Sequence, residues 1–126
     1  MRNNSKSTTR DFVKNLRSDD RKDLFGILGI LKEYNLDVVA RGSSVGRESK
    51  QSYHDVDLLI SGNREEYKRA FLRFEAFKYM PYTGAMGPYV GEPEIEDRFK
   101  IRNFDISYSP KLQNEDIEQV YLLRRH

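Results

Sequence analysis

The chain has 126 residues, of which 37% are hydrophobic and 33% charged, and its formal net charge of +2 neither requires nor excludes a nucleic-acid partner. It contains no cysteine, which excludes disulfides and thiolate zinc sites. Since no apolar run approaches the roughly 20 residues that span a bilayer, and no signal peptide opens the chain, we expect a cytoplasmic protein with no membrane partner.

The first elements are expected to be a flexible arm and then helices. Residues 1–10 are polar and rich in Ser, Thr and Asn, so we expect them to precede one domain over residues 11–126. Helical spacing begins near Asp11, and one buried face is marked by Leu24, Ile27, Leu28, Leu31 and Tyr34. The segment 18–20, Ser-Asp-Asp, offers a break into two helices because Ser and Asp favour caps, and Asn35 offers a stop.

Two strands are predicted next. Residues 38–41 read as a short strand that ends at Gly42, and the polar stretch 44–53 reads as a loop. Residues 55–60 then form a second strand, in which Val56, Leu58 and Ile60 share one face and Asp55 and Asp57 the other.

The second half repeats the order of helix and strands. The clearest helix has Tyr67, Ala70, Phe71, Phe74 and Phe77 on one face. A Gly-rich connection, 83–91, precedes two alternating strands, 98–102 and 104–108, and we expect a last helix over 112–125 with Ile117, Val120 and Tyr121 inward. This order predicts an α/β (α+β) domain, with helices packed on a small mixed β-sheet.

Asp55 and Asp57 give the chain its strongest chemical signal. On one strand face their carboxylates are about 7 Å apart and repel each other unless a cation lies between them. The Gly42-Ser43 turn just upstream suits a phosphate, because glycine lets the backbone approach closely. The combination indicates chemistry on a nucleoside triphosphate (NTP).

This ordered set resembles the polymerase-beta-like nucleotidyltransferase superfamily, in particular its minimal and kanamycin-nucleotidyltransferase-like members. The family pattern is Gly-Ser at a strand end, a loop, Asp-apolar-Asp on the next strand, and a third carboxylate on a later strand after a helix. Gly42-Ser43, Asp55-Val56-Asp57 and Asp105 match these parts, and the resemblance covers about residues 24–108. It implies a nucleotidyltransferase-like fold.

The resemblance also implies roles for residues. Asp55, Asp57 and Asp105 would hold two Mg²⁺ or Mn²⁺ ions, and Asp105 would take the proton of the acceptor hydroxyl. The NTP would be bound by a set consisting of Gly42, Ser43, Ser44, Arg47 and Lys50. The chain departs from the family pattern in the order Val-Gly-Arg at 45–47 and in His54, which stands where the family has Ser; His54 is expected to pack or to support the site without binding metal.

Other interpretations remain open at this point. The Asp-X-Asp pair would also suit the solvated face of an edge strand, and Asp105 could form an ion pair with Arg98 or Arg102. One of the acidic residues of segment 92–97, which are Glu92, Glu94, Glu96 and Asp97, could replace Asp105 as the third carboxylate. The alternative function is a non-catalytic binding module of the same fold, an antitoxin or regulatory subunit that acts by protein contact. An RNA-binding domain is the weakest reading, since no aromatic-basic motif is present. Because the domain is small, a homodimer or a protein partner would complete the site.

Overall fold

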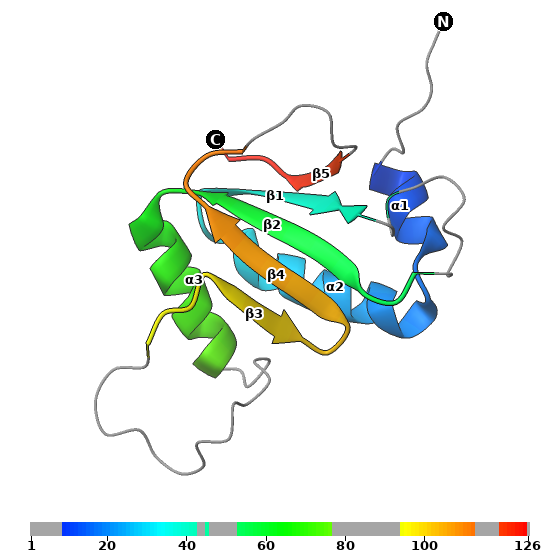
Figure 1. The fold of residues 1–126 in the computed structure, drawn as a ribbon, viewed down its shortest axis with the longest axis horizontal. Helices are drawn as coiled ribbons and strands as arrows, with labels where there is room; N and C mark the ends of the chain where they lie inside the picture. The colour runs from blue at the N-terminus through cyan, green and yellow to red at the C-terminus, as the bar shows by residue number, and fades with distance from the viewer. Residues whose placement is uncertain (1–8, 43–44, 46–52, 77–93, 113–118, 126) are drawn as a thin grey trace, which may run out of the picture.

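The computed structural model describes residues 9–42, 45, 53–76, 94–112 and 119–125. These residues form three helices and a five-stranded sheet (Figure 1). The helices are α1 (Thr9–Asn15), α2 (Ser18–Leu31) and α3 (Arg64–Ala76). The strands are β1 (Leu36–Arg41), β2 (Val56–Gly62), β3 (Arg98–Ile101), β4 (Phe104–Ser109) and β5 (Gln119–Leu123). The predicted mixed α/β class, with helices on one small sheet, is confirmed.

The sheet has the strand order β3-β4-β2-β1-β5. Strands β2 and β4 are parallel, and the other three pairings are antiparallel. Parallel neighbours need a long connection between them, and here α3 and β3 lie within that connection. The central pair of strands therefore joins the two halves of the chain.

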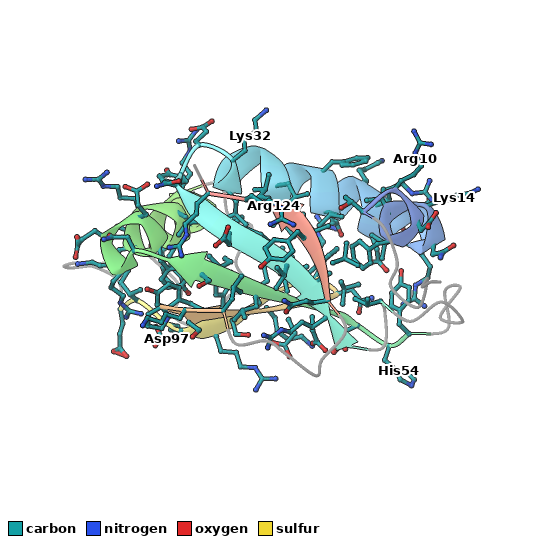
Figure 2. All side chains as sticks on the ribbon, turned by 90° about the horizontal axis from the view of Figure 1, so that it is seen from above. Arg10, Lys14, Lys32, His54, Asp97 and Arg124 are labelled. Atoms are coloured by element: carbon teal, nitrogen blue, oxygen red, sulfur yellow. The ribbon has the colours of Figure 1, made fainter. Side chains whose placement is uncertain are left out.

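The molecule has two layers, with the helices on one face of the sheet (Figures 1 and 2). Strand alternation sends one set of side chains to that face, where they are fully or almost fully buried; this set includes Val38, Ala40, Val56, Leu58, Ile60, Phe99, Ile101, Phe104 and Ile106. Helix residues complete the core, among them Leu24, Ile27, Leu31, Tyr67, Phe71 and Phe74. The opposite face carries the buried side chains of Val39 and Leu59 beside polar ones such as Asp57, and the candidate site lies there.

The helices follow the sequence pattern closely. The two helices offered as one reading are present, but the break lies just before 18–20, because α1 ends at Asn15 and α2 begins at Ser18. Helix α2 ends at Leu31, a few residues before the predicted stop. Helix α3 begins after Asn63, whose side-chain oxygen accepts hydrogen bonds from the backbone N–H groups of Glu65 (2.8 Å) and Glu66 (3.3 Å), as an N-cap residue does.

The predicted last helix over 112–125 is wrong, because the described part of this segment contains the strand β5. Val120 is inserted into the core and Tyr121 pairs with Val39 of β1. Helical and strand periods are hard to separate over a short apolar run, and Val and Tyr fit the pleated surface beside β1 well. Ile117, the third residue of the predicted helical face, lies outside the described residues.

Some predictions fall on other parts of the chain. Of the predicted arm, residues 9 and 10 belong to α1 and residues 1–8 lie outside the described residues. Phe77 and the Gly-rich segment 83–91 also lie outside them. Among the described residues, none of the helices combines the length and the apolar character that crossing a bilayer requires.

Candidate functional site

One row of side chains crosses all five strands on the face of the sheet opposite the helices. The parallel register of β2 and β4 pairs Asp57 with Asp105. The antiparallel registers extend the row to Lys100 on β3, Arg41 on β1 and Gln119 on β5. Neighbouring strands are about 4.8 Å apart, so two of the predicted carboxylates occupy adjacent positions at the centre of the row, with a basic residue on each side.

Asp57 lies on β2 as the sequence predicts, whereas Asp55 immediately precedes the strand, which begins at Val56. Val56 and Leu58 alternate with them and are buried in the core. Asp57 as a residue is exposed, but partial desolvation of its carboxyl raises its pKa, and the negative charges of Asp55 and Asp105 add to the effect. Desolvation is the main cause of the raised pKa, and the two neighbouring carboxylates add negative charge that a cation would relieve.

Gly42 approaches Asp57 so closely that a side chain at position 42 would displace the Asp57 carboxylate. Its φ is +84°, and a Cβ atom added there would lie 2.6 Å from Asp57 Oδ2. The N–H of Val45 donates to the Gly42 carbonyl oxygen at 3.0 Å, which closes a turn. The predicted turn is therefore present at Gly42. Ser43, Ser44, Arg47 and Lys50, the other residues of the predicted NTP-binding set, lie outside the described residues.

Two basic residues of β3 pair with the carboxylates. Arg98 donates two hydrogen bonds to Asp105, from Nε to Oδ1 at 3.1 Å and from Nη2 to Oδ2 at 2.7 Å. Lys100 Nζ lies 3.6 Å from Asp55 Oδ2. The ion pair of Asp105 that the sequence left open is thus formed with Arg98, whereas Arg102 pairs with Asp23 at 3.8 Å.

The Arg98 contact changes the chemistry of Asp105. Hydrogen bonds from the guanidinium lower the pKa of the Asp105 carboxyl below its ordinary value. A carboxylate with a lowered pKa is a weaker base. The predicted role of Asp105 as proton acceptor therefore requires that its pair with Arg98 opens.

Sequence reasoning missed Arg41 and Lys100 as members of this site and considered Arg98 only as an ion-pair partner of Asp105, although one signal was available. Residues 98–101 alternate basic and apolar, and Phe99 and Ile101 are buried in the core. In a sheet with one helical layer, the alternate residues Arg98 and Lys100 must share the face of Asp105. The register between β3 and β4, which places Lys100 opposite Asp105, was not predictable from the pattern.

A buried polar cluster connects the two segments that lead into β2 and β4. Asp20 of α2 accepts hydrogen bonds from the Tyr53 hydroxyl (2.6 Å) and from Asn103 Nδ2 (3.3 Å). Tyr53 precedes β2, and Asn103 precedes β4 and accepts the Val56 N–H at 2.9 Å. Arg17 stacks over the Tyr53 ring, 4.1 Å from its centroid. The cluster fixes the starts of the two strands relative to α2, close to the aspartates.

The donor set fits a hard divalent cation in the chemistry of its side chains. All three side chains offer carboxylate oxygens, which Mg²⁺ and Mn²⁺ prefer, and Asp57 lies next to both other aspartates in the site. Within the described ranges, however, no three acidic or histidine side chains are gathered closely enough to hold a metal ion. In this conformation Asp55 and Asp105 contact the cations of β3 instead.

The remaining candidates lie elsewhere. Asp97 pairs with Arg64 of α3, and its carbonyl oxygen accepts the N–H of Tyr108, near the far end of β4 from Asp105. Glu94 and Glu96 are exposed, and Glu92 lies outside the described residues. His54 does not pack against the protein: it is exposed and projects away from the sheet (Figure 2).

Comparison of the chain with known protein families, with curated proteins and with solved structures returned no significant match.

Proposed function

We propose that this protein is a metal-dependent nucleotidyltransferase, which moves a nucleoside monophosphate unit from an NTP to a hydroxyl or phosphate acceptor. The observation that carries the proposal is the pairing of Asp57 with Asp105 across parallel strands, with Asp55 two residues before Asp57 and Gly42 against the Asp57 carboxylate. Carboxylates concentrated in this way call for bound cations, and NTP chemistry supplies cations together with its substrate.

The reaction balances in one displacement. An acceptor oxygen forms a bond to the α-phosphorus, the bond from the α-phosphorus to the bridging oxygen breaks, and pyrophosphate leaves with the electron pair. Bound Mg²⁺ or Mn²⁺ would supply charge stabilisation at the attacking and leaving oxygens. The three aspartates would hold the ions, and one carboxylate would receive the acceptor's proton. Gly42 would let the triphosphate approach the backbone.

Binding of NTP is the first test, because it does not depend on knowing the acceptor. The full chain is titrated with each NTP in the presence of Mg²⁺ or Mn²⁺ and again with EDTA. We expect saturable binding that requires the metal and is lost in Asp57→Asn. Transfer of an α-phosphate label to RNA ends, proteins or small hydroxyl compounds is then followed for wild type and variant.

Asp37→Asn provides the matched control. Asp37 is another aspartate on a strand, β1. Its neighbour in the sheet register is Ser61 of β2, outside the site, and its carboxylate binds Arg125. Asn keeps an acceptor oxygen for the backbone N–H of Arg125, which in the wild-type protein donates to Asp37 Oδ1 at 2.8 Å. The control should bind NTP as wild type does. A folded wild-type protein that binds no NTP with either metal would overturn the proposal.

A second candidate function is a non-catalytic binding module of the same fold, which acts by protein contact. The ion pairs of β3 favour it, because Arg98 and Lys100 already compensate two of the three carboxylates. A site neutralised by its own protein needs no metal to be stable. This candidate predicts a folded chain with no metal-dependent NTP binding, and the titration above separates the two.

The proposed enzyme also needs a surface that holds the base or the acceptor. The described part of the chain forms one sheet with one layer of helices, and the carboxylates lie on the face without helices. A second copy of the chain or a protein partner on that face would supply the missing surface. Size-exclusion chromatography with light scattering, with and without NTP and metal, tests for the second copy.

A further inference from the structure

The contact between β3 and the carboxylates has a specific geometry. Arg98 uses both Nε and Nη2 to bind both oxygens of Asp105. This fork is the arrangement in which arginine binds a carboxylate or a phosphate most selectively. As long as it is formed, a divalent cation can bind the β3-facing side of Asp105 only by displacing the guanidinium.

The two partners differ in exposure. The Arg98 side chain is 75% exposed, while that of Asp105 is 15% exposed. An ion pair whose cation lies in solvent contributes at most about 1 kcal/mol, and the bidentate geometry places this pair at the upper end of that range. The carboxylate is thus held in place by the sheet, and the guanidinium is a weakly held counterion on a long, mobile side chain. Replacement of the Arg98 guanidinium by another cation at Asp105 therefore costs little free energy.

The negative charge of the Asp57 carboxylate has no counterion of its own among the described residues. By contrast, Asp105, opposite it on β4, and Asp55, two residues before it, are paired with Arg98 and Lys100. A cation that entered beside Asp57 would therefore be attracted by Asp55 and Asp105 as well. It would compete directly with the β3 pairs.

We propose that Arg98 is an exchangeable counterion, which occupies Asp105 in the metal-free protein and, once a divalent cation displaces it, binds the triphosphate of the NTP. This inference rests on the proposed function. The displaced guanidinium stays on the strand next to Asp105, within reach of a ligand bound at the row, and its fork fits phosphate oxygens as well as it fits a carboxylate. One residue thus couples metal entry to anion binding.

Arg98→Gln tests both halves of the exchange, with opposite signs. Mn²⁺ alone is titrated into the full chain and the free Mn²⁺ is followed by electron paramagnetic resonance. Without its competitor, the variant should bind Mn²⁺ more tightly, by up to about fivefold, which corresponds to the upper range for an exposed pair. Inorganic triphosphate is then titrated at saturating Mn²⁺, and its affinity for the variant should fall by about tenfold.

Arg69→Gln is the control for net charge. Arg69 on α3 is also a highly exposed arginine, at 69%, and it pairs with Glu66 at 3.2 Å. Arg69→Gln should change neither the affinity for Mn²⁺ nor the affinity for inorganic triphosphate. Urea unfolding establishes that both variants fold.

The outcomes separate the inference from the proposed function. Mn²⁺ binding that is lost in Asp57→Asn but is equal in Arg98→Gln and Arg69→Gln would overturn the exchange and leave the metal site intact. Tighter Mn²⁺ binding with unchanged triphosphate affinity would also overturn it, since the second role of Arg98 would be absent. If neither wild type nor Arg98→Gln binds Mn²⁺, the inference and the proposed function both fail.

Discussion

Gly42 and Asp57 constrain each other at the level of single atoms. The backbone of residue 42 has a positive φ, and Asp57 Oδ2 lies where the side chain of any other residue would begin. The torsion angle favours a glycine here, and a larger residue would in addition displace the carboxylate. The sequence predicts a turn at this position, but it does not reveal that the turn closes over an aspartate.

Gly42→Ala should therefore destabilise the fold by about 1–3 kcal/mol, the cost of holding an ordinary residue in a strained backbone region. It should also push the Asp57 carboxylate aside and weaken any metal binding. Gly29→Ala is the matched control, because a Cβ at Gly29 meets nothing within 4 Å and alanine favours the interior of α2 by about 0.8–1 kcal/mol. Urea unfolding of both variants measures the difference, and an unchanged Gly42→Ala would contradict the geometry.

Asp23 provides a pH-dependent prediction. Burial raises its pKa, the nearby Asp20 and Asp19 add to this, and Arg102 opposes it. Since the folded pKa lies above the unfolded value of about 3.9, ionisation of Asp23 costs stability, and that cost develops as pH rises through the folded pKa. Asp23→Asn should thus be more stable than wild type at pH 7, by up to about 0.5 kcal/mol.

The difference should disappear near pH 3, where the wild-type carboxyl is protonated as well. Urea midpoints of both proteins at the two pH values provide the measurement. If Asp23→Asn were less stable at pH 7, the pair with Arg102 would contribute more than burial costs.

Among the elements, the two helical faces and the first four strands were predictable, because each has a clear period over enough residues. The break before Ser18 was one of two readings. The capping preference of Ser and Asp locates it approximately, but the N-cap residue is Arg17, whose side chain makes no capping hydrogen bond. Strand β5 was not predictable, since Val120 and Tyr121 suit a helix face until β1 provides a pleated partner. Of the candidate site, the aspartates could be found from spacing, whereas their pairing with β3 depends on strand order and register.

The cluster around Asp20 acts between elements. The Tyr53 hydroxyl donates to Asp20 and accepts the backbone N–H of Arg17 at 2.8 Å, so one oxygen atom joins α2 to the segment before β2. Tyr53→Phe leaves a buried carboxylate short of a donor and an N–H without its acceptor. The expected cost is about 1–3 kcal/mol.

Tyr34→Phe is the comparison for this variant. Tyr34 is partly buried at the margin of the core. Its hydroxyl forms no hydrogen bond with another described residue. Its loss should change the free energy of unfolding by less than about 0.5 kcal/mol. Equal stability of the two variants in urea would show that the Tyr53 hydroxyl does not join the elements.

At the scale of the whole molecule, one layer of helices on one face of the sheet places the main hydrophobic core between helices and sheet. Phe71 is 2% exposed and lies edge-on to Phe99 of β3, with ring centroids 5.2 Å apart, whereas Phe25 of α2 is 58% exposed. Phe71→Ala should cost about 3–5 kcal/mol, a large share of the stability of a small domain.

Phe25→Ala should change stability by no more than about 0.5 kcal/mol. Denaturant unfolding of both variants tests the two-layer arrangement. A large loss in Phe25→Ala would mean that another surface covers α2, and would make the packing of this helix two-sided.

The parallel pairing of β2 with β4 also determines when the site comes into existence. Asp57 and Asp105 come from opposite halves of the chain, and they meet only after the long connection through α3 and β3 has closed, a step whose entropy cost slows folding. A chain that has completed β1 and β2 already carries two of the aspartates, but not the neighbour on β4 or the counterions on β3. Conversely, detachment of β3 and β4 dismantles the row while the β1–β2 pairing persists. The row of side chains across the sheet is thus complete only in the fully folded protein, because it forms only when both halves of the chain are joined.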